Sequence, residues 1–377
     1  MVFDRSLCEA AFRDAVDACD PALEVALAIE QTPALRAPRT RYGLAIGKAA
    51  LAMARGVGPV ARGVAVTTAD DGAPLPAGWS RTVAGHPEPD ARSLAAGDEV
   101  IDLVAQATAA DVIVACISGG ASALVERPLS GVTLDALRAE VRGLAAAGAP
   151  IGELNRARVA RSAIKGGKLA RMSEAPVVTF AISDVPGDDL AVIGSGPTIA
   201  GRSGDVAVVV AKRVQFARAF AAALGGRGVA GLARLAHRAV DAAPMDGDVA
   251  AIAGELARPR DGVRVAWGEP TVRVPADHGD GGRAQQLALE LARLLRGTAR
   301  RAFVAGSDGQ DGPAPRGRPA PAGAFVDGGT WDAIAAAGVD PARALARCDA
   351  GSALAAIGAL AITGPTGVNH ADVAVIT

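Results

Sequence analysis

Short apolar runs that alternate with segments of helical spacing are the feature that most constrains the fold of this 377-residue chain. Strand-like runs occupy residues 42–46, 63–67, 111–118 and 176–183. Helical spacing covers residues 7–29, 90–107 and 134–147. Strands that alternate with helices predict a parallel sheet covered by helices. We therefore expect an α/β fold over the first half of the chain.

The second half predicts a separate α/β domain. Residues 205–256 have helical spacing almost throughout, whereas the later segments alternate again: strand-like runs at 263–267, 271–274 and 301–305, and a helix at 282–295. A loop is expected over 306–323, which is crowded with Gly, Pro and Arg. Because single cores rarely grow beyond about 250–300 residues, we expect two domains. The predicted boundaries are 1–258, with a helical interdomain region at about 205–258, and 259–377.

Composition and charge exclude several classes of protein. Aromatic residues make up only 3% of a chain that is 50% hydrophobic, which suits a core of Ala, Val, Leu and Ile between helices and strands. Lys and Arg total 39 against 40 Asp and Glu, so no overall positive field attracts nucleic acid or an anionic membrane. The four cysteines lack CxxC spacing, which argues against a zinc site or a disulfide scaffold. We expect a cytoplasmic protein, because the N-terminus lacks the pattern of a signal peptide.

Two turns at the ends of predicted strands could bind phosphate. The run 112–117 leads into Ser118-Gly119-Gly120-Ala121-Ser122 and then a helix-compatible segment. Such a turn directs backbone N–H groups toward an anion, although glycines also suit a tight turn without a ligand. Lys48 follows the first strand in Gly47-Lys48, but the spacing of a Walker A loop is absent. A cation at a helix start opposes the helix dipole, which favours a charge role for Lys48.

Two further segments carry clustered charges. Asp184, Asp188 and Asp189 follow the run 176–183, at the edge where open α/β sheets bind ligands, and suit Mg²⁺ or a base. The alternative is a turn with capping aspartates. The run 155–168 holds five cations, and spacing places Arg158, Arg161 and Lys165 on one predicted helical face. That face could meet an anion or could simply be solvated.

The second half repeats this pattern of glycine turns beside charges. Glu269 lies between two strand-like runs, and Arg283 opens a helix after Gly279-Asp280-Gly281-Gly282, where its planar fork could grip a carboxylate or phosphate. Two later glycine turns, 306–312 and 363–367, follow or adjoin strands. Each turn is weak evidence alone, because turns need glycine, but their repetition suggests a cleft lined by loops.

These segments, in this order, resemble the class II glycerate 2-kinases. The motifs that carry the likeness are GHPEPD (85–90), ISGGASAL (117–124), IKGGKLA (164–170), SDVPGDDL (183–190), SGPT (195–198), GDGGRAQQLAL (279–289), GSDGQDGP (306–313) and TGPTG (363–367). The resemblance implies a Rossmann-like parallel-sheet N-terminal domain, a smaller α/β C-terminal domain called MOFRL, and an active site in the interdomain cleft. It also implies transfer of the γ-phosphoryl group of ATP to the 2-hydroxyl of D-glycerate.

The resemblance implies roles for individual residues. Lys48 would stabilise the transferring phosphoryl group, and Arg283 would reach the substrate or the phosphates. Our own hypothesis is that Asp184 acts as base or, with Asp189, holds Mg²⁺. The expected substrate-binding residues are Asn155, Arg158, Lys165 and Glu269. The expected phosphate-binding residues are Ser118, Gly119, Gly120, Ser122, Gly306, Asp308, Gly364 and Thr366. The expected partner is a small hydroxy acid, without nucleic acid or membrane, and a homodimer is left open.

Departures from the family pattern leave the substrate open. Val159-Ala160 replaces Lys-His, Ala284 and Gln286 replace Asn and Glu, and Asp349-Ala350-Gly351 stands where the family tends to read DSY. The segment Thr366–Asp372 also departs. Loss of polar groups beside a substrate changes which hydroxy acid fits. Besides a glycerate kinase, the alternatives are a kinase for another hydroxy acid, a reductase that uses NAD(P)H on hydroxypyruvate, since relatives are often labelled so, and an inactive binding protein.

Overall fold

The structure, a computed structural model, describes residues 3–229, 232, 240–241, 243–312 and 320–377. Contacts within the chain form two compact units. The parallel-sheet unit comprises Asp20–Lys212 and Gly367–Asn369. The antiparallel-sheet unit comprises Met1–Cys19, Arg213–Thr366 and His370–Thr377. Each unit is described by itself.

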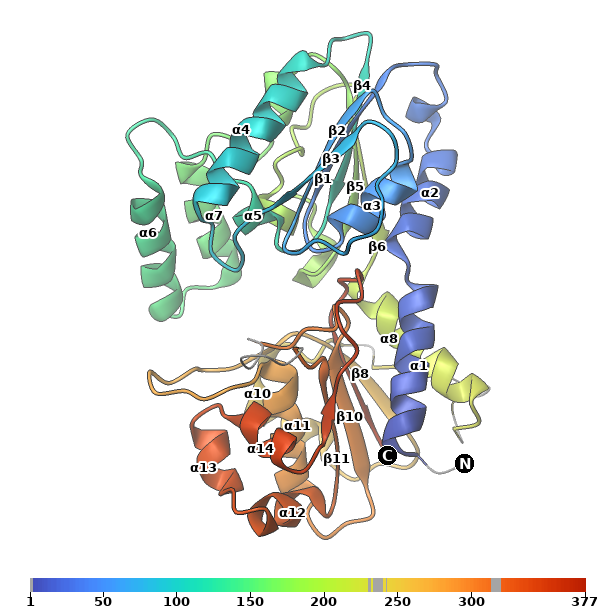
Figure 1. Cartoon of the computed structure of the whole chain (residues 1–377), viewed down its shortest axis with the longest axis vertical. Helices are drawn as coiled ribbons and strands as arrows, with labels where there is room; N and C mark the ends of the chain where they lie inside the picture. The colour runs from blue at the N-terminus through green and yellow to red at the C-terminus, as the bar shows by residue number, and fades with distance from the viewer. Residues whose placement is uncertain (1–2, 230–231, 233–239, 242, 313–319) are drawn as a thin grey trace. The chain divides into compact units, whose positions relative to one another are not determined.

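Six parallel strands form the centre of the parallel-sheet unit (Figure 1). They are β1 (Arg41–Ile46), β2 (Arg62–Thr67), β3 (Trp79–Val83), β4 (Val112–Ile117), β5 (Val177–Ile182) and β6 (Val206–Ala211). Their order in the sheet is β3-β2-β1-β4-β5-β6. The chain therefore builds outward from β1 in one direction and then, with β4, in the other. Ligands of open α/β sheets bind at such a reversal, beyond the carboxyl ends of the strands.

Helices cover both faces of this sheet, because the strand residues that point to each face are apolar. The helices of this unit are α2 (Pro21–Gln31), α3 (Ala50–Val57), α4 (Ala91–Gln106), α5 (Ala121–Leu124), α6 (Leu134–Ala146) and α7 (Ile151–Arg161); α2 and α3 pack on one face, α4 and α5 pack on the other, and α6 packs on α7. One face of β4, with Ile113 and Ile117, packs in the cluster that α4 and α5 join. The other face, with Val114 and Cys116, packs in the cluster of α2 and α3. Figure 1 shows α4 and α3 on opposite sides of the sheet.

The antiparallel-sheet unit has five strands in the order β12-β11-β10-β13-β8. They are β8 (Arg264–Gly268), β10 (Arg301–Gly306), β11 (Gly323–Asp327), β12 (Leu360–Ala361) and β13 (Asp372–Ile376); β7 (Gly247–Asp248) and β9 (Pro270–Thr271) form a separate parallel pair. The helices are α1 (Arg5–Ala18), α8 (Arg213–Gly226), α10 (Val249–Leu256), α11 (Arg283–Leu294), α12 (Thr330–Ala336), α13 (Pro341–Ala346) and α14 (Ala350–Ala356). Helices α10–α14 share the apolar cluster on one face of the sheet.

An aromatic cluster covers the other face of the antiparallel sheet. Phe12 of α1 lies 5.0 Å from Phe216 of α8 and 6.2 Å from Phe303 of β10, measured between ring centroids. Phe220 of α8 lies 5.8 Å from Phe303. The first helix of the chain therefore packs on the sheet formed by its second half. This contact places the compact units' boundaries at 19/20 and 212/213, whereas the sequence suggested one near 258/259.

The two-domain α/β fold class is confirmed, and so are the four strands predicted in the first half. The helix predicted over 7–29 is two helices, because Asp20-Pro21 starts a new one at α2, where the Asp20 carboxylate accepts from Ala22 N at 2.9 Å. The helical prediction for 205–256 is wrong at β6, an edge strand whose residues are mostly partly or fully exposed, without regular alternation. Residues 230–231, 233–239 and 242 of that region lie outside the described residues. Of the strand predicted at 271–274, only Thr271 belongs to one.

None of the described helices is both long enough and apolar enough to cross a bilayer.

Candidate active site

The turns that follow β1 and β4 are joined by hydrogen bonds. Lys48 N donates to Gly119 O at 2.9 Å, and Ala49 N donates to the hydroxyl of Ser118 at 3.1 Å. Ser118 is fully buried. A Cβ atom at Gly47, where φ is +136°, would overlap the Ser118 hydroxyl. Glycine is thus required at 47, and the side chain of Ser118 holds the two turns together.

Several of the predicted site residues lie around the Gly119-Gly120 turn. A Cβ atom at 119 would overlap the carboxylate of Asp184, which follows β5, and the amide nitrogen of Asn369. Gly120 has φ of +85°, and a Cβ atom there would lie 3.1 Å from the His86 ring and 3.5 Å from Lys48 Cγ. Within the described chain, the amides of Gly119 and Gly120 donate no hydrogen bond. Lys48, Asp184 and these two amides therefore lie at one corner of the sheet.

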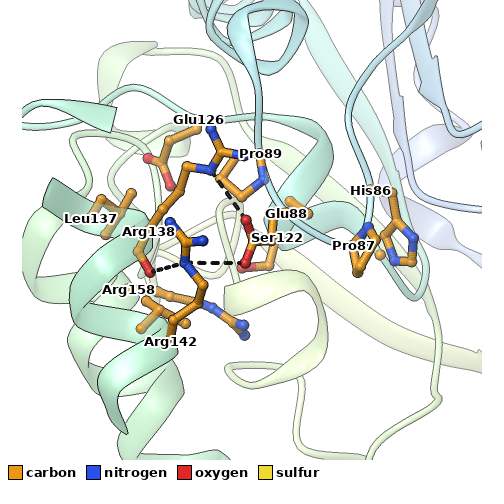
Figure 2. Close-up of a pocket in the computed structure, with 13 residues that line it drawn as sticks. His86, Pro87, Glu88, Pro89, Ser122, Glu126, Leu137, Arg138, Arg142 and Arg158 are labelled. Atoms are coloured by element: carbon orange, nitrogen blue, oxygen red, sulfur yellow. Dashed lines mark hydrogen bonds and ion pairs between the residues drawn. The ribbon is translucent and has the colours of Figure 1, made fainter. Parts of the chain in front are cut away.

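A cavity of about 300 Å³ opens beside this turn, within the same unit (Figure 2). It is lined by polar, charged and apolar residues of four segments: His86, Pro87, Glu88, Pro89, Gly120, Ser122, Ala123, Glu126, Leu137, Arg138, Val141, Arg142 and Arg158. The hydroxyl of Ser122 lies 2.8 Å from that of Ser195. The cavity therefore joins the glycine turn to the basic helix α7 that the sequence singled out.

The basic segment is arranged differently from the prediction. Helix α7 ends at Arg161, and Ser162 adopts extended backbone angles, so Lys165 lies beyond the helix and does not share its face with Arg158. Arg161 pairs with Glu140 at 2.9 Å outside the cavity. Arg158 alone of the three lines the cavity. Burial lowers the pKa of the Arg158 guanidinium, while the charge of Glu126 opposes this effect.

Lys165 forms a buried ion pair instead. Its ammonium donates to the Glu126 carboxylate and, at 3.3 Å, to Val125 O, and both side chains of the pair are 1% exposed. Ser162 donates to Glu126 at 2.6 Å, and Arg127 N donates at 2.9 Å. Burial lowers the pKa of Lys165, and Glu126 partly offsets that shift. Lys165 thus acts on the cavity only through Glu126, which forms part of its wall.

The other candidate site residues of this unit differ in their exposure to solvent. Asp189 is exposed, and its carboxylate accepts from Ala191 N at 2.9 Å, so it caps a turn. Asn155 is half-buried on α7, one turn before Arg158, and does not line the cavity. Among the described residues, no three His, Cys, Asp or Glu side chains gather as metal ligands. A single carboxylate at Asp184 remains compatible with Mg²⁺, which usually takes one or two carboxylates plus phosphate oxygens.

In the antiparallel-sheet unit, Arg283 is held between two carboxylates. Its Nε donates to Asp372 at 2.7 Å, and its Nη1 donates to Glu269 at 3.0 Å. Asp372 begins β13 between the last residues of β8 and β10, Gly268 and Gly306. Burial lowers the pKa of Arg283, but Asp372 and Glu269 outweigh it and raise that pKa. Burial raises the pKa of Asp372, and Arg283 pulls it down. Arg283 is 35% exposed, so its fork keeps a face toward solvent.

The predicted phosphate turns of this unit lie together. Thr366 donates its backbone N–H to Asp308 O at 3.1 Å and its hydroxyl to Ser307 O at 2.6 Å. A Cβ atom at Gly309 would overlap Gly364 O, so the two turns are packed backbone to backbone. Gly306 is adjacent, with its Cβ position 3.3 Å from carboxylate oxygens of Asp308 and Asp372. Residue 313, the last of this motif, lies outside the described residues.

Several residues near these sites were missed by the sequence reasoning. Asp311, 4% exposed, accepts from Ala284 N at 3.0 Å and Gln285 N at 2.7 Å, and so caps α11 behind Arg283. Its position as a second aspartate in a glycine loop was the available signal. Glu126 was signalled by its place as a charge ending an apolar run. Arg138 and Arg142 show only i, i+4 spacing, which is common on solvated helices.

His370 is a buried histidine that the sequence treated as structural or solvated. It is 1% exposed, and neither ring nitrogen has a hydrogen-bond partner among the described residues. Burial lowers its pKa to about 4. Because the folded chain favours the neutral ring, His370 contributes stability above its unfolded pKa of about 6.5, and that stability is lost as pH falls toward 4.

The variant His370→Leu tests this pH dependence. We expect wild type to lose about 2–3 kcal/mol more unfolding free energy than the variant between pH 7 and pH 4.5, because only the wild type must protonate a buried ring. At pH 7 the variant should match or exceed wild type, since it removes unpaired polar atoms. Urea denaturation at both pH values measures the difference. Equal pH dependence of the two proteins would exclude this role.

Comparison with known proteins identifies relatives over nearly the whole chain. Residues 7–224 match a domain of unknown function, DUF4147, and residues 262–372 match the MOFRL family. A glycerate 2-kinase of Pyrococcus horikoshii is 31% identical, over 89% of this chain and 87% of its own. A protein of Agrobacterium vitis with the provisional name hydroxypyruvate reductase is 33% identical, over 97% and 92%. The crystal structure of a Thermotoga maritima glycerate kinase superposes with a TM-score of 0.77 at 28% identity, covering 98% of each chain.

Proposed function

Since this chain belongs to the class II glycerate kinase family, we propose that it is a glycerate 2-kinase, which transfers the γ-phosphoryl group of ATP to the 2-hydroxyl of D-glycerate. The observation that carries the proposal is the meeting of Lys48, the Gly119-Gly120 turn and Asp184 where the strand order reverses. Phosphoryl transfer needs positioning and charge neutralisation more than covalent help from the protein. A lysine, free backbone N–H groups and a carboxylate supply these needs.

Lys48 and the glycine turn are assigned to the phosphates. The amides of Gly119 and Gly120 are available donors beside Lys48, and an anion placed there would meet one full charge and two dipoles. Ser118 contributes by fixing the turn, because its hydroxyl already accepts from Ala49 N. Ser122, which lines the cavity, is also assigned to the phosphates. We assign the phosphate turns at Gly306, Asp308, Gly364 and Thr366 to the nucleotide.

Asp184 is assigned to Mg²⁺ or to the proton of the substrate hydroxyl. Its half-buried carboxylate adjoins the phosphate turn, and it follows a buried strand that fixes its backbone. When bound, Mg²⁺ would neutralise charge on the phosphate oxygens. Asp189 is the weaker candidate of the pair proposed from the sequence, because its exposed carboxylate already caps a turn.

Arg158 is assigned to the carboxylate of the hydroxy acid. It lines the cavity that begins at Gly120, and a desolvated guanidinium binds a carboxylate more strongly than an exposed one. The ion pair of Lys165 and Glu126 supports this wall, and Asn155, one turn before Arg158 on α7, is assigned to the same substrate. The cavity therefore provides a place for the acceptor next to the place proposed for the phosphates.

Arg283 is assigned a catalytic role, with Glu269 beside it. We expect Arg283→Lys to lower kcat/KM about 10- to 100-fold, since lysine keeps the charge but loses the planar fork held by Asp372 and Glu269. The matched control is Arg264→Lys, which removes a similar fork on Asp241 in the same unit. Steady-state kinetics and thermal unfolding of both variants separate a catalytic from a structural effect. Equal activity losses in the two variants would remove Arg283 from the site.

The test of the proposed function is an assay of the purified chain with ATP, Mg²⁺ and a panel of hydroxy acids. The expected result is ATP-dependent formation of 2-phosphoglycerate from D-glycerate. NADH and hydroxypyruvate are tested in parallel, because one relative bears a reductase name. Turnover with NADH and none with ATP would overturn the proposal in favour of a reductase; turnover with neither would favour a binding protein. The proposal includes a cytoplasmic setting and leaves a homodimer open.

A further inference from the structure

The cavity beside the glycine turn holds more positive charge than glycerate needs. Three of its lining residues are arginines and two are glutamates, and one of those, Glu126, is already paired with Lys165. Glu88 is thus the lining carboxylate left for three guanidinium groups. Asp135 also approaches Arg138, at 3.6 Å, but it is 91% exposed and belongs to the outer surface of α6. Solvent screens such an exposed pair strongly.

The surplus charge lies on α6, apart from the residue assigned to the substrate carboxylate. Figure 2 shows Glu88 between Arg138 and Arg142, which lie one turn apart on that helix. Arg138 Nε lies 3.3 Å and Arg142 Nε 3.5 Å from the Glu88 carboxylate. These are long contacts for guanidinium and carboxylate, whose hydrogen bonds are usually about 2.7–2.9 Å. Arg142 Nε also donates to Arg138 O at 3.4 Å, so Glu88 satisfies each arginine only in part, and among the described residues the Nη groups of Arg142 and Nη2 of Arg138 have no hydrogen-bond partner.

The volume of the cavity also exceeds what glycerate needs. Glycerate has seven heavy atoms, and at the roughly 30 Å³ that one water molecule occupies in the liquid they would fill about 210 Å³. The cavity measures about 300 Å³. A bound glycerate that is held by Arg158 would therefore leave about 90 Å³ for a second carboxylate, and a bulkier phosphate, which needs about 120 Å³ by the same measure, can extend into solvent beside Arg142, whose side chain is 62% exposed. The walls of that space include Arg138 and Arg142.

We infer that the cavity binds 2-hydroxy acids that carry a second anionic group, a carboxylate or a phosphate, more tightly than it binds glycerate. Arg158 holds the shared carboxylate, and Arg138 with Arg142 receives the second anion as it displaces Glu88. The inference rests on the proposed function in one respect, the placement of the shared carboxylate at Arg158. A charge-assisted fork to a second anion would strengthen binding about tenfold.

Calorimetric titration of the full chain with three probes tests this inference. D-glycerate has one anionic group, D-malate adds a carboxylate, and 3-phospho-D-glycerate adds a phosphate. We expect at least one of the two-anion probes to bind about tenfold more tightly than D-glycerate, and the tighter one identifies the second group. Equal affinity for all three probes overturns the inference.

Variants of α6 test whether its arginines are responsible. Arg138→Gln/Arg142→Gln should reduce the affinity ratio to within about twofold, whereas Arg161→Gln, at a residue that pairs with Glu140 and does not line the cavity, should leave it unchanged. Arg142→Gln alone, at a position 62% exposed, serves if the double variant does not fold, and should reduce the ratio about threefold. An unchanged ratio in these variants overturns the inference. The kinase assay is run separately, so tight binding without turnover would count against the proposed function alone.

Discussion

Lys48→Ala is expected to lower kcat with D-glycerate about 10²- to 10³-fold, while the Michaelis constant changes little. The reason is that the ammonium is assigned to charge that develops on the transferring phosphoryl group, and loss of one such donor usually has an effect of that size. The backbone of Lys48 keeps its bond to Gly119 O, and its side chain is only half-buried, so the fold should survive. Steady-state kinetics and circular dichroism measure both effects.

Lys212→Ala is the matched control for this prediction. Lys212 belongs to the same unit, is 59% exposed and lies 3.5 Å from Asp188, so it reports the effect of removing a surface cation. Its kcat should stay within about twofold of wild type, because exposed pairs contribute little. Activity near wild type in Lys48→Ala would refute the assignment of Lys48. A similar loss of kcat in both variants would show that removing any cation from this unit lowers activity, and that the effect is not specific to Lys48.

The sequence predicted the position of those candidate residues that directly follow a strand. Lys48, Ser118 to Ser122 and Asp184 each follow an apolar run, so their position at the carboxyl edge follows from the parallel fold. The order of the strands could not be predicted, because it depends on which strands pair across long distances in the sequence. Only that order, β1 beside β4, brings Lys48 to the Gly119-Gly120 turn.

The positions of other residues could not be predicted, because they depend on where a helix or strand ends and on which elements pack together. Helical spacing suggested that Lys165 continues the face of Arg158, but the helix stops at Arg161, and the ammonium turns inward to Glu126. The strand β6 escaped prediction because it lies at an edge, with a less regular pattern of burial. Similarly, the packing of α1 on the antiparallel sheet follows from Phe12 meeting Phe303, a contact between residues almost 300 positions apart.

Lys165→Met is expected to reduce the unfolding free energy of the parallel-sheet unit by about 3–5 kcal/mol. The variant leaves the Glu126 carboxylate buried at 1% exposure, and the described part of the chain then offers it the Ser162 hydroxyl and Arg127 N as donors. Two neutral donors do not compensate a desolvated negative charge. Urea denaturation followed by circular dichroism measures the loss, and Arg161→Met, which breaks an exposed pair with Glu140 in the same unit, should cost less than about 1 kcal/mol.

The double variant Glu126→Gln/Lys165→Met separates the charge effect from the effect of packing. Glutamine can still accept from Ser162 and removes the unpaired charge, so stability should return to within about 1–2 kcal/mol of wild type. If the double variant is as unstable as Lys165→Met, the loss comes from side-chain packing and the ion pair is incidental. If it is stable yet binds D-glycerate at least about tenfold more weakly, Glu126 acts on Arg158 in the cavity wall, because the charge of Glu126 offsets part of the desolvation of that guanidinium.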